Sequence, residues 1–207
     1  MEREIRGIIW DMGGVILRTM DPSPRTELAK HFGLTRKELE NVAFLGDDSR
    51  IAELGQITRE EHWSRVASQF GMSPQDGHIF EDQFWAGDRV DKDLITFISA
   101  LRSKYKTGLL SNAWSDMREL LNGYMPGCLD VFDASVFSYE VGLVKPDERI
   151  FQLILDKLGV QPSQAVFIDD FEINIAGAQA AGLNAIQFKT LEQVKMVLAE
   201  QYQVFPG

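Results

Sequence analysis

The sequence of 207 residues contains one cysteine, Cys128, and no apolar run close to the ~20 residues that a membrane helix requires. One cysteine excludes a disulfide within the chain and argues against a thiolate metal cluster. The charged opening "MEREIRG" leads directly toward a strand and lacks the apolar segment of a signal peptide. These absences predict a cytoplasmic protein.

Basic residues are also scarce: 21 Lys and Arg stand against 31 Asp and Glu, a formal net charge of −10, and no basic run offsets it locally. Such a surface repels nucleic acid and anionic lipid, so we expect no nucleic-acid and no membrane partner. The composition, 44% hydrophobic and 25% charged, is ordinary for a globular protein. The length suits one substantial domain, with or without a smaller inserted one.

Short apolar runs alternate with helical patterns in the C-terminal half. The expected strands are 7–10, 106–111, 134–137, 165–168 and 184–188. Between them, apolar residues recur on one helical face, as at Leu94, Phe97, Ile98 and Leu101. This alternation predicts an α/β fold, a doubly wound, Rossmann-like parallel sheet with helices on both faces.

Residues 20 to about 86 interrupt that rhythm with helical spacing and no convincing strand. Trp63, Val66, Ala67 and Phe70 share one helical face in this segment. We predict an inserted all-helical cap over 20–86 and a core formed by 1–19 and 87–207, with hinges near 17–22 and 86–92.

Polar residues follow four of the expected strands at the point where each ends. They are Asp11 after "GIIW", "SNAW" at 111–114, "VKPD" at 144–147 and "DDFEIN" at 169–174. Alone, each has a structural explanation: Ser-Asn and Asp-Asp often cap helices, and Lys-Pro is common in exposed loops. Ligands of open parallel sheets bind at the carboxyl ends of the strands, so the four together predict one site.

With these motifs the chain resembles the haloacid dehalogenase (HAD) superfamily, whose phosphatases carry four ordered motifs. "WDMGGVIL" looks like the first, with Asp11 as nucleophile, and Ser111 with Asn112 matches the second. Lys145 matches the third, and "FIDDFEINIAGAQAAG" resembles the fourth. The insertion after the first strand is where one subfamily of this superfamily has its helical cap.

Three carboxylates meeting at one point repel each other, and a hard cation such as Mg²⁺ relieves that repulsion. The resemblance implies that Asp11 and Asp170 bind Mg²⁺ directly, that the Gly13 carbonyl is another ligand and that Asp169 acts through water. It implies hydrolysis through an aspartyl-phosphate on Asp11.

The other groups are expected to bind the substrate. Lys145 would supply charge to the transferring phosphoryl oxygens, and Ser111 a donor. Further donors would be the backbone N–H groups after Asp11, where Gly13 and Gly14 allow close approach, together with Asn112.

The cap is expected to choose the substrate by closing over the site. Within "FLGDDSRIAELGQIT" (44–58), Asp47, Asp48 and Arg50 are the candidates for contact with the leaving group.

The sequence departs from the family pattern at Gly13. Most phosphatases of the superfamily carry a second Asp there, which protonates the leaving group and activates water. Its absence predicts slow turnover, or assistance from a water or a cap residue. The first motif here, DxGxV, resembles a subgroup that includes glucose 1-phosphate phosphatases.

The expected function is therefore a Mg²⁺-dependent phosphatase acting on a small phosphorylated metabolite, a sugar phosphate being one candidate, as a monomer or homodimer. Two alternatives stay open. A haloacid dehalogenase would use the same Asp chemistry at carbon without metal, and a non-catalytic HAD-fold protein would bind or regulate without turnover.

Overall fold

The apolar run before Asp11 forms the central strand of a five-stranded sheet, and all four of its residues are buried. In the computed structural model, which describes residues 4–207, this strand β1 (Gly7–Trp10) pairs with β4 on one side and β6 on the other. The order is β5-β4-β1-β6-β7 and every pairing is parallel. The predicted α/β fold with a Rossmann-like core is confirmed.

The expected strands match the observed ones to within one residue at each end. After β1, the strands are β2 (Leu17–Thr19), β3 (Asp88–Val90), β4 (Lys106–Ser111), β5 (Ala134–Phe137), β6 (Ala165–Asp169) and β7 (Asn184–Gln187). The helices before β4 are α1 (Ser23–His31), α2 (Arg36–Leu45), α3 (Asp47–Glu53), α4 (Arg59–Gln69), the 3₁₀ turn Pro74–Asp76, α5 (Gly77–Trp85) and α6 (Lys92–Leu101). Those after it are α7 (Met117–Tyr124), α8 (Ser138–Val141), α9 (Glu148–Leu158), the 3₁₀ turn Pro162–Gln164, α10 (Glu172–Ala180) and α11 (Leu191–Tyr202).

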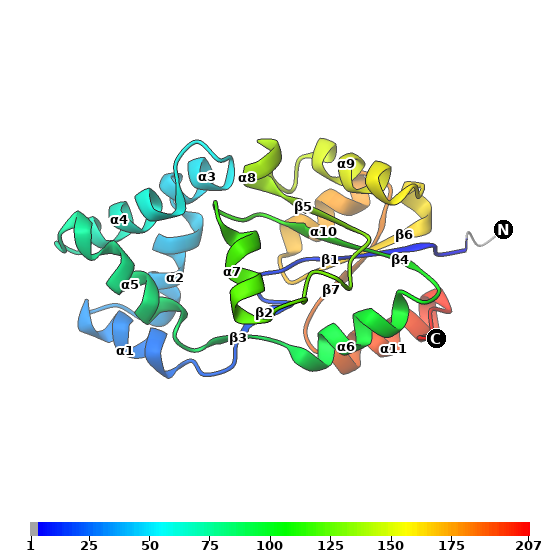
Figure 1. Ribbon diagram of the computed structural model, residues 1–207, viewed down its shortest axis with the longest axis horizontal. Helices are drawn as coiled ribbons and strands as arrows, with labels where there is room; N and C mark the ends of the chain where they lie inside the picture. Colours follow the sequence, from blue (N-terminus) through cyan, green and yellow to red (C-terminus); the bar gives the residue numbers. More distant parts are fainter. Residues whose placement is uncertain (1–3) are drawn as a thin grey trace.

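Helices cover both faces of the sheet, as Figure 1 shows. Because successive side chains of a strand point to opposite faces, Ile8 and Trp10 pack in one apolar cluster and Ile9 in another. The first cluster includes the apolar faces of α6 and α11, and the second those of α9 and α10. The sheet is thus buried on both sides, and its carboxyl edge is where polar groups can gather.

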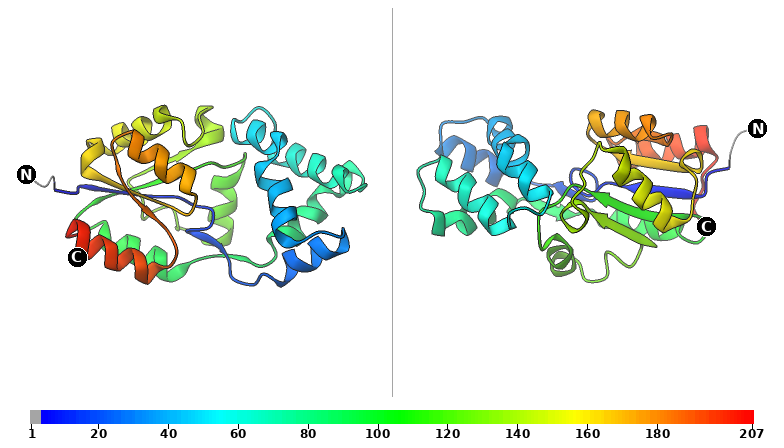
Figure 2. Two further views of the ribbon diagram at one scale, coloured as in Figure 1. Left: turned by 180° about the vertical axis from the view of Figure 1, so that it is seen from behind. Right: turned by 90° about the horizontal axis from the view of Figure 1, so that it is seen from above.

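Helices α1 to α5 form a separate all-helical cap with its own apolar cluster (Figure 2). Helices α2 and α4 begin in the same way: Thr35 and Thr58 each accept a backbone hydrogen bond from a Glu three residues later, whose carboxylate accepts one in return. Trp63, Phe80 and Phe84 are fully buried in the cap cluster. The predicted helical insertion is confirmed.

A two-stranded antiparallel ribbon links the cap to the core, and the sequence did not reveal it. Strand β2 enters the cap and β3 leaves it, with Leu17 opposite Val90 and Thr19 opposite Asp88. Each strand has only three residues and carries charge, and the partners lie far apart in the chain, so no local pattern marks them. The ribbon lies at both predicted hinges. The domain boundaries at 19/20 and 86/87 remain a proposal.

Trp114 also joins the two parts of the molecule. It follows β4 in the core, yet its side chain is 4% exposed and belongs to the apolar cluster of the cap. Its ring stacks on Phe44 with centroids 5.9 Å apart and lies 4.3 Å from the ring of His62. The core therefore contributes a side chain to the interior of the cap.

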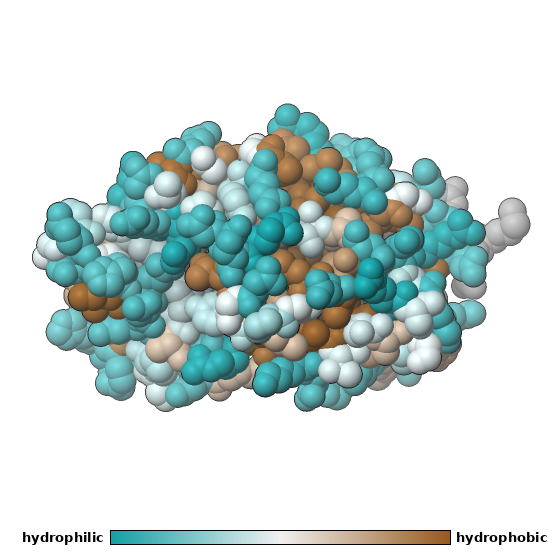
Figure 3. Space-filling view, viewed as in Figure 1, coloured by the Kyte–Doolittle hydropathy of each residue, from teal (hydrophilic) through white to brown (hydrophobic). Residues whose placement is uncertain are grey.

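The face shown in Figure 3 is mostly hydrophilic over the cap, with hydrophobic patches gathered over the core half. Among residues 4–207, no helix combines the length and the apolar character needed to cross a membrane.

Trp114→Ala is expected to lower the free energy of unfolding by about 3–5 kcal/mol, because it leaves a cavity in the cap cluster. Met196→Ala is the matched control: this side chain on α11 is 53% exposed, and its loss should change stability by less than about 0.5 kcal/mol. Urea denaturation followed by fluorescence and circular dichroism measures both. Equal stability of the two variants would show that Trp114 does not join cap and core.

Candidate active site

Three carboxylates from two neighbouring strands meet at the carboxyl edge of the sheet. Asp11 follows β1, Asp169 is the last residue of β6, and Asp170 comes directly after it. One oxygen of each lies within 4.8 Å of the others. Asp11 and Asp169 are almost completely buried, and Asp170 is half-buried. The structure thus brings together the acids that the sequence predicted to converge.

Lys145 lies between two of these carboxylates. Its Nζ is 2.6 Å from Asp11 Oδ1 and 2.6 Å from Asp169 Oδ2, and the residue is only 3% exposed. Burial alone would lower the pKa of Lys145, but the charges of Asp11 and Asp169 outweigh it and raise the pKa. The ammonium group therefore stays charged beside Asp11.

Asn112 holds the backbone of Lys145. Its Oδ1 accepts from the Lys145 N–H at 2.8 Å, and its Nδ2 donates to the Lys145 carbonyl at 3.2 Å. These two bonds connect the end of β4 to the loop after α8. Asn112, predicted as a substrate-binding residue, is thus engaged in positioning Lys145.

Asn174, which belongs to the fourth motif expected from the sequence, holds Asp169 in a similar way. Its Nδ2 donates to both carboxylate oxygens of Asp169, at 3.0 and 3.2 Å, and the Phe171 N–H donates to Oδ1 at 2.8 Å. Asn174 ends the "DDFEIN" stretch one helical turn after Asp170, so its place in that motif was the available signal.

One ammonium does not neutralise three carboxylates. Burial and the charge of Asp169 raise the pKa of Asp11 to about 8, although Lys145 opposes them, and burial raises the pKa of Asp170 to about 6. Asp170 Oδ1 is buried without a hydrogen-bond partner among residues 4–207. Such an oxygen is costly unless a ligand satisfies it, and carboxylate oxygens are the ligands that Mg²⁺ prefers. The residues present fit that cation.

The turn after Asp11 explains why two glycines follow it. A Cβ on Gly14 would lie 2.2 Å from Asp170 Oδ2, and Gly14 has φ +74°, so a side chain is excluded there. A Cβ on Gly13 would meet no atom within 4 Å. The Gly14 N–H, predicted as a phosphate donor, instead donates to the Leu17 carbonyl at 2.9 Å. Within 4–207 the N–H groups of Met12 and Gly13 have no partner and are the donors available beside Asp11.

Ser111 ends β4 and is buried, and its hydroxyl donates to the Asn112 carbonyl at 3.2 Å. The predicted cap residues lie on α3. Asp47 is exposed in the first turn and forms no hydrogen bond or ion pair within residues 4–207. Arg50 is exposed one turn later, and its charge lowers the pKa of Asp147, although the main cause there is Arg149. Their contact with substrate stays a prediction.

Glu53 is a cap residue that the sequence analysis missed. It is the last residue of α3, one turn after Arg50 and on the same face of the helix. Burial raises its pKa to about 7, opposed by the charges of Arg50 and Lys145. The field of Lys145 thus reaches one carboxyl of the cap.

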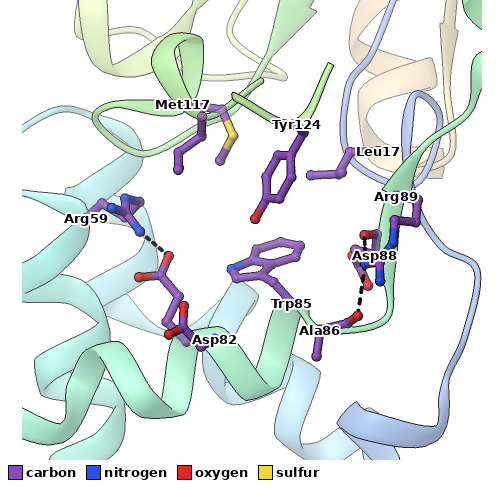
Figure 4. Close-up of a pocket in the computed structure, with 11 residues that line it drawn as sticks. Leu17, Arg59, Asp82, Trp85, Ala86, Asp88, Arg89, Met117 and Tyr124 are labelled. Atoms are coloured by element: carbon purple, nitrogen blue, oxygen red, sulfur yellow. Dashed lines mark hydrogen bonds and ion pairs between the residues drawn. The ribbon is translucent and has the colours of Figure 1, made fainter. Parts of the chain in front are cut away.

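A cavity of about 290 Å³ lies between the cap, the ribbon and α7, and it contains none of the predicted site residues. Figure 4 shows Tyr124 and Trp85 pointing toward one another across it, with Arg59 at one side. Arg59 forms an ion pair with Glu81, which also lines the cavity. It is a space between the two parts of the molecule, separate from the carboxylates.

Residues 5–182 match the family of haloacid dehalogenase-like hydrolases. The chain is 29% identical over 201 residues to acyl-CoA dehydrogenase family member 10 of Mus musculus; the match covers 89% of this chain and 18% of that protein. It therefore spans less than a fifth of that relative's length.

Two further relatives match over nearly their whole length. Fructose-1-phosphate phosphatase YqaB of Escherichia coli (strain K12) is 27% identical over 200 residues, which cover 92% of this chain and 100% of that one. A HAD family enzyme from Bacteroides thetaiotaomicron, solved as a magnesium complex, is 25% identical with a TM-score of 0.74 and coverages of 96% and 100%.

Gly14→Ala is expected to weaken Mg²⁺ binding at least about tenfold, because the new methyl group displaces the carboxylate of Asp170. Gly13→Ala is the matched control, since its methyl group enters open space. The Mg²⁺-dependent rise in melting temperature, titrated by scanning calorimetry, measures both affinities. Equal Mg²⁺ responses in the two variants would contradict this account of the turn.

Proposed function

Because the chain belongs to the haloacid dehalogenase-like hydrolases, we propose that it is a Mg²⁺-dependent phosphatase that forms an aspartyl-phosphate on Asp11. The observation that carries the proposal is the meeting of Asp11, Asp169 and Asp170 beside Lys145, with one oxygen of Asp170 unpartnered among residues 4–207. The similarity to a phosphatase over its whole length supports the same reading.

In the proposed reaction, a carboxylate oxygen of Asp11 attacks phosphorus and the bond to the leaving oxygen breaks. The Lys145 ammonium orients Asp11 and offsets charge on the phosphoryl oxygens, and the N–H groups of Met12 and Gly13 donate to them. Ser111 is the proposed side-chain donor. Asp11, Asp170 and the Gly13 carbonyl would hold Mg²⁺, with Asp169 acting through water. The cation would neutralise the carboxylates and polarise the phosphate.

Water then attacks the aspartyl-phosphate, releasing inorganic phosphate and the free Asp11 carboxylate. Asp169 is hydrogen-bonded to Lys145, to Asn174 and to the Phe171 N–H. In the proposal it is therefore not the base of this second step; it fixes Lys145 and would contact the cation through water.

The proposed substrate is a small phosphorylated metabolite, with sugar phosphates as the first class to test because one full-length relative is a fructose-1-phosphate phosphatase. Asp47 and Arg50 on α3 are the proposed cap contacts. A cytoplasmic location, and action as a monomer or homodimer, belong to the same proposal.

Two other functions have less support. A haloacid dehalogenase needs no metal, so the orphaned oxygen of Asp170 would have no purpose in it. A binding protein without turnover needs no nucleophile held at 2.6 Å by a buried ammonium group.

Asp11→Asn is expected to reduce hydrolysis of an aryl phosphate by more than about 10³-fold, because the amide cannot form the phosphoryl ester. Asp82→Asn, an exposed cap variant with the same chemical change, should keep wild-type activity. Release of nitrophenolate measures both. Full activity of the Asp11 variant would refute the nucleophile.

Removal of divalent cations with EDTA is expected to stop hydrolysis, and excess Mg²⁺ to restore it, because the three carboxylates then repel both the phosphate and one another. EDTA saturated with Mg²⁺ beforehand is the control for chelator effects. Activity that persists at full rate in metal-free buffer would rule out the metal role and favour the dehalogenase chemistry.

A further inference from the structure

The proposed phosphatase has Gly13 at the position where most phosphatases of the superfamily are expected to carry an Asp as proton carrier. An alkoxide leaving group needs a proton, and the water that later attacks the aspartyl-phosphate needs a base. Gly13 has no side chain to do either. Attack and departure lie on opposite sides of the phosphoryl group. Since Asp11 attacks from the core, the leaving oxygen faces the cap, where the missing carrier must be sought.

Glu53 lies where the cap meets the core. Helix α3, which it ends, packs against α8, and α8 directly follows β5 of the sheet (Figure 1). Two residues after Glu53 the backbone is so close to α8 that a Cβ on Gly55 would lie 2.5 Å from the Tyr139 carbonyl oxygen. The end of α3 is thus fixed against the loops that carry the site.

The surroundings of Glu53 suit a group that exchanges protons. Its carboxyl is half-buried and makes no hydrogen bond or ion pair with any residue in the range 4–207. Helices α2, α4 and α8 pack against α3, and the charges that act on the carboxyl are those of Arg50 and Lys145. Burial outweighs both and brings its pKa to about 7, the range in which an acid also serves as a base.

Three other ionisable groups of the cap have partners or surroundings that keep them from this role. Asp48 pairs with Arg65 at 2.9 Å, and Glu81 pairs with Arg59 beside the separate cavity. His62 is fully buried in contact with Trp114, and burial lowers its pKa to about 4. Among the cap residues that the structure describes with a shifted pKa, Glu53 is the only one whose pKa is affected by the charge of Lys145.

We propose that Glu53 is the general acid and general base of this enzyme, replacing the side chain absent at Gly13; the inference rests on the phosphatase function proposed above. In the first step Asp11 bonds to phosphorus, the bond to the leaving oxygen breaks, and that oxygen takes the proton of Glu53. In the second, the Glu53 carboxylate takes a proton from water, whose oxygen bonds to phosphorus as the bond to Asp11 breaks. Glu53 is then protonated again.

The test compares Glu53→Gln with wild type on an alkyl phosphate, such as a hexose monophosphate, and on nitrophenyl phosphate. Glutamine keeps the shape but carries no transferable proton. The first turnover of the alkyl ester should slow by about 10²-fold or more. The first turnover of nitrophenyl phosphate should not slow, because nitrophenolate departs without a proton. For nitrophenyl phosphate, a burst should be followed by a lower steady-state rate, because no base activates the water that hydrolyses the aspartyl-phosphate.

Two further measurements separate proton transfer from a structural role. In wild type, kcat/KM for the alkyl ester should decline as the pH rises through about 7, because the acid form of Glu53 is lost; the decline should vanish in Glu53→Gln. Adding Gly13→Asp to Glu53→Gln should restore part of the alkyl rate, because that position has open space. Glu60→Gln, exposed on α4, is the matched control and should behave as wild type.

Wild-type rates and pH dependence in Glu53→Gln on the alkyl ester would overturn the proposal, as would equal slowing of both first turnovers, which indicates distortion of the site. Either result leaves the phosphatase function intact as long as wild type hydrolyses nitrophenyl phosphate and Asp11→Asn does not. Failure of the phosphatase function is recognised separately, by a wild-type protein inactive on both esters with Mg²⁺ present.

Discussion

The arrangement of the candidate active site depends on one buried ammonium group that lies between two buried carboxylates. Lys145 contacts Asp11 and Asp169 at 2.6 Å each, and Asn112 fixes its backbone while Asn174 fixes Asp169. Asp11, Asn112 and Asp169 follow or end strands of the parallel sheet, Asn174 lies in the first turn of α10, and Lys145 lies in the loop between α8 and α9. Without the ammonium group, the burial of Asp11 and Asp169 would be prohibitive. With it, a negative charge remains that a divalent cation can balance.

The two glycines after Asp11 have different physical reasons. Gly14 is required by its backbone conformation and by the nearness of Asp170, so it secures the geometry of the carboxylates. Gly13 is required by neither, since a side chain would have room there. The packing around Gly13 therefore does not explain why a side chain is absent there. Because Gly13 cannot carry a proton, the proposed proton carrier is a residue of the cap, Glu53.

The sequence predicted the sheet and the convergence of Asp11, Lys145, Asp169 and Asp170 because both depend on local patterns combined with one general rule about strand ends. It did not predict the ribbon of β2 and β3 or the clamp of Asn112 on Lys145. These depend on pairs distant in the chain, whose partners only the folded structure brings together. Glu53 was not predicted for another reason. It differs from the other acids of the cap in its burial, which raises its pKa, and the sequence around it does not reveal that burial.

Trp114 has an implication for how such proteins diversify. It stands two residues after Asn112, so the same short loop fixes Lys145 in the core and fills the interior of the cap. A cap with a different interior would have to accommodate Trp114, or else change the loop that also holds Lys145. Point substitutions on the exposed side of α3, where the proposed substrate contacts lie, would leave that loop unchanged.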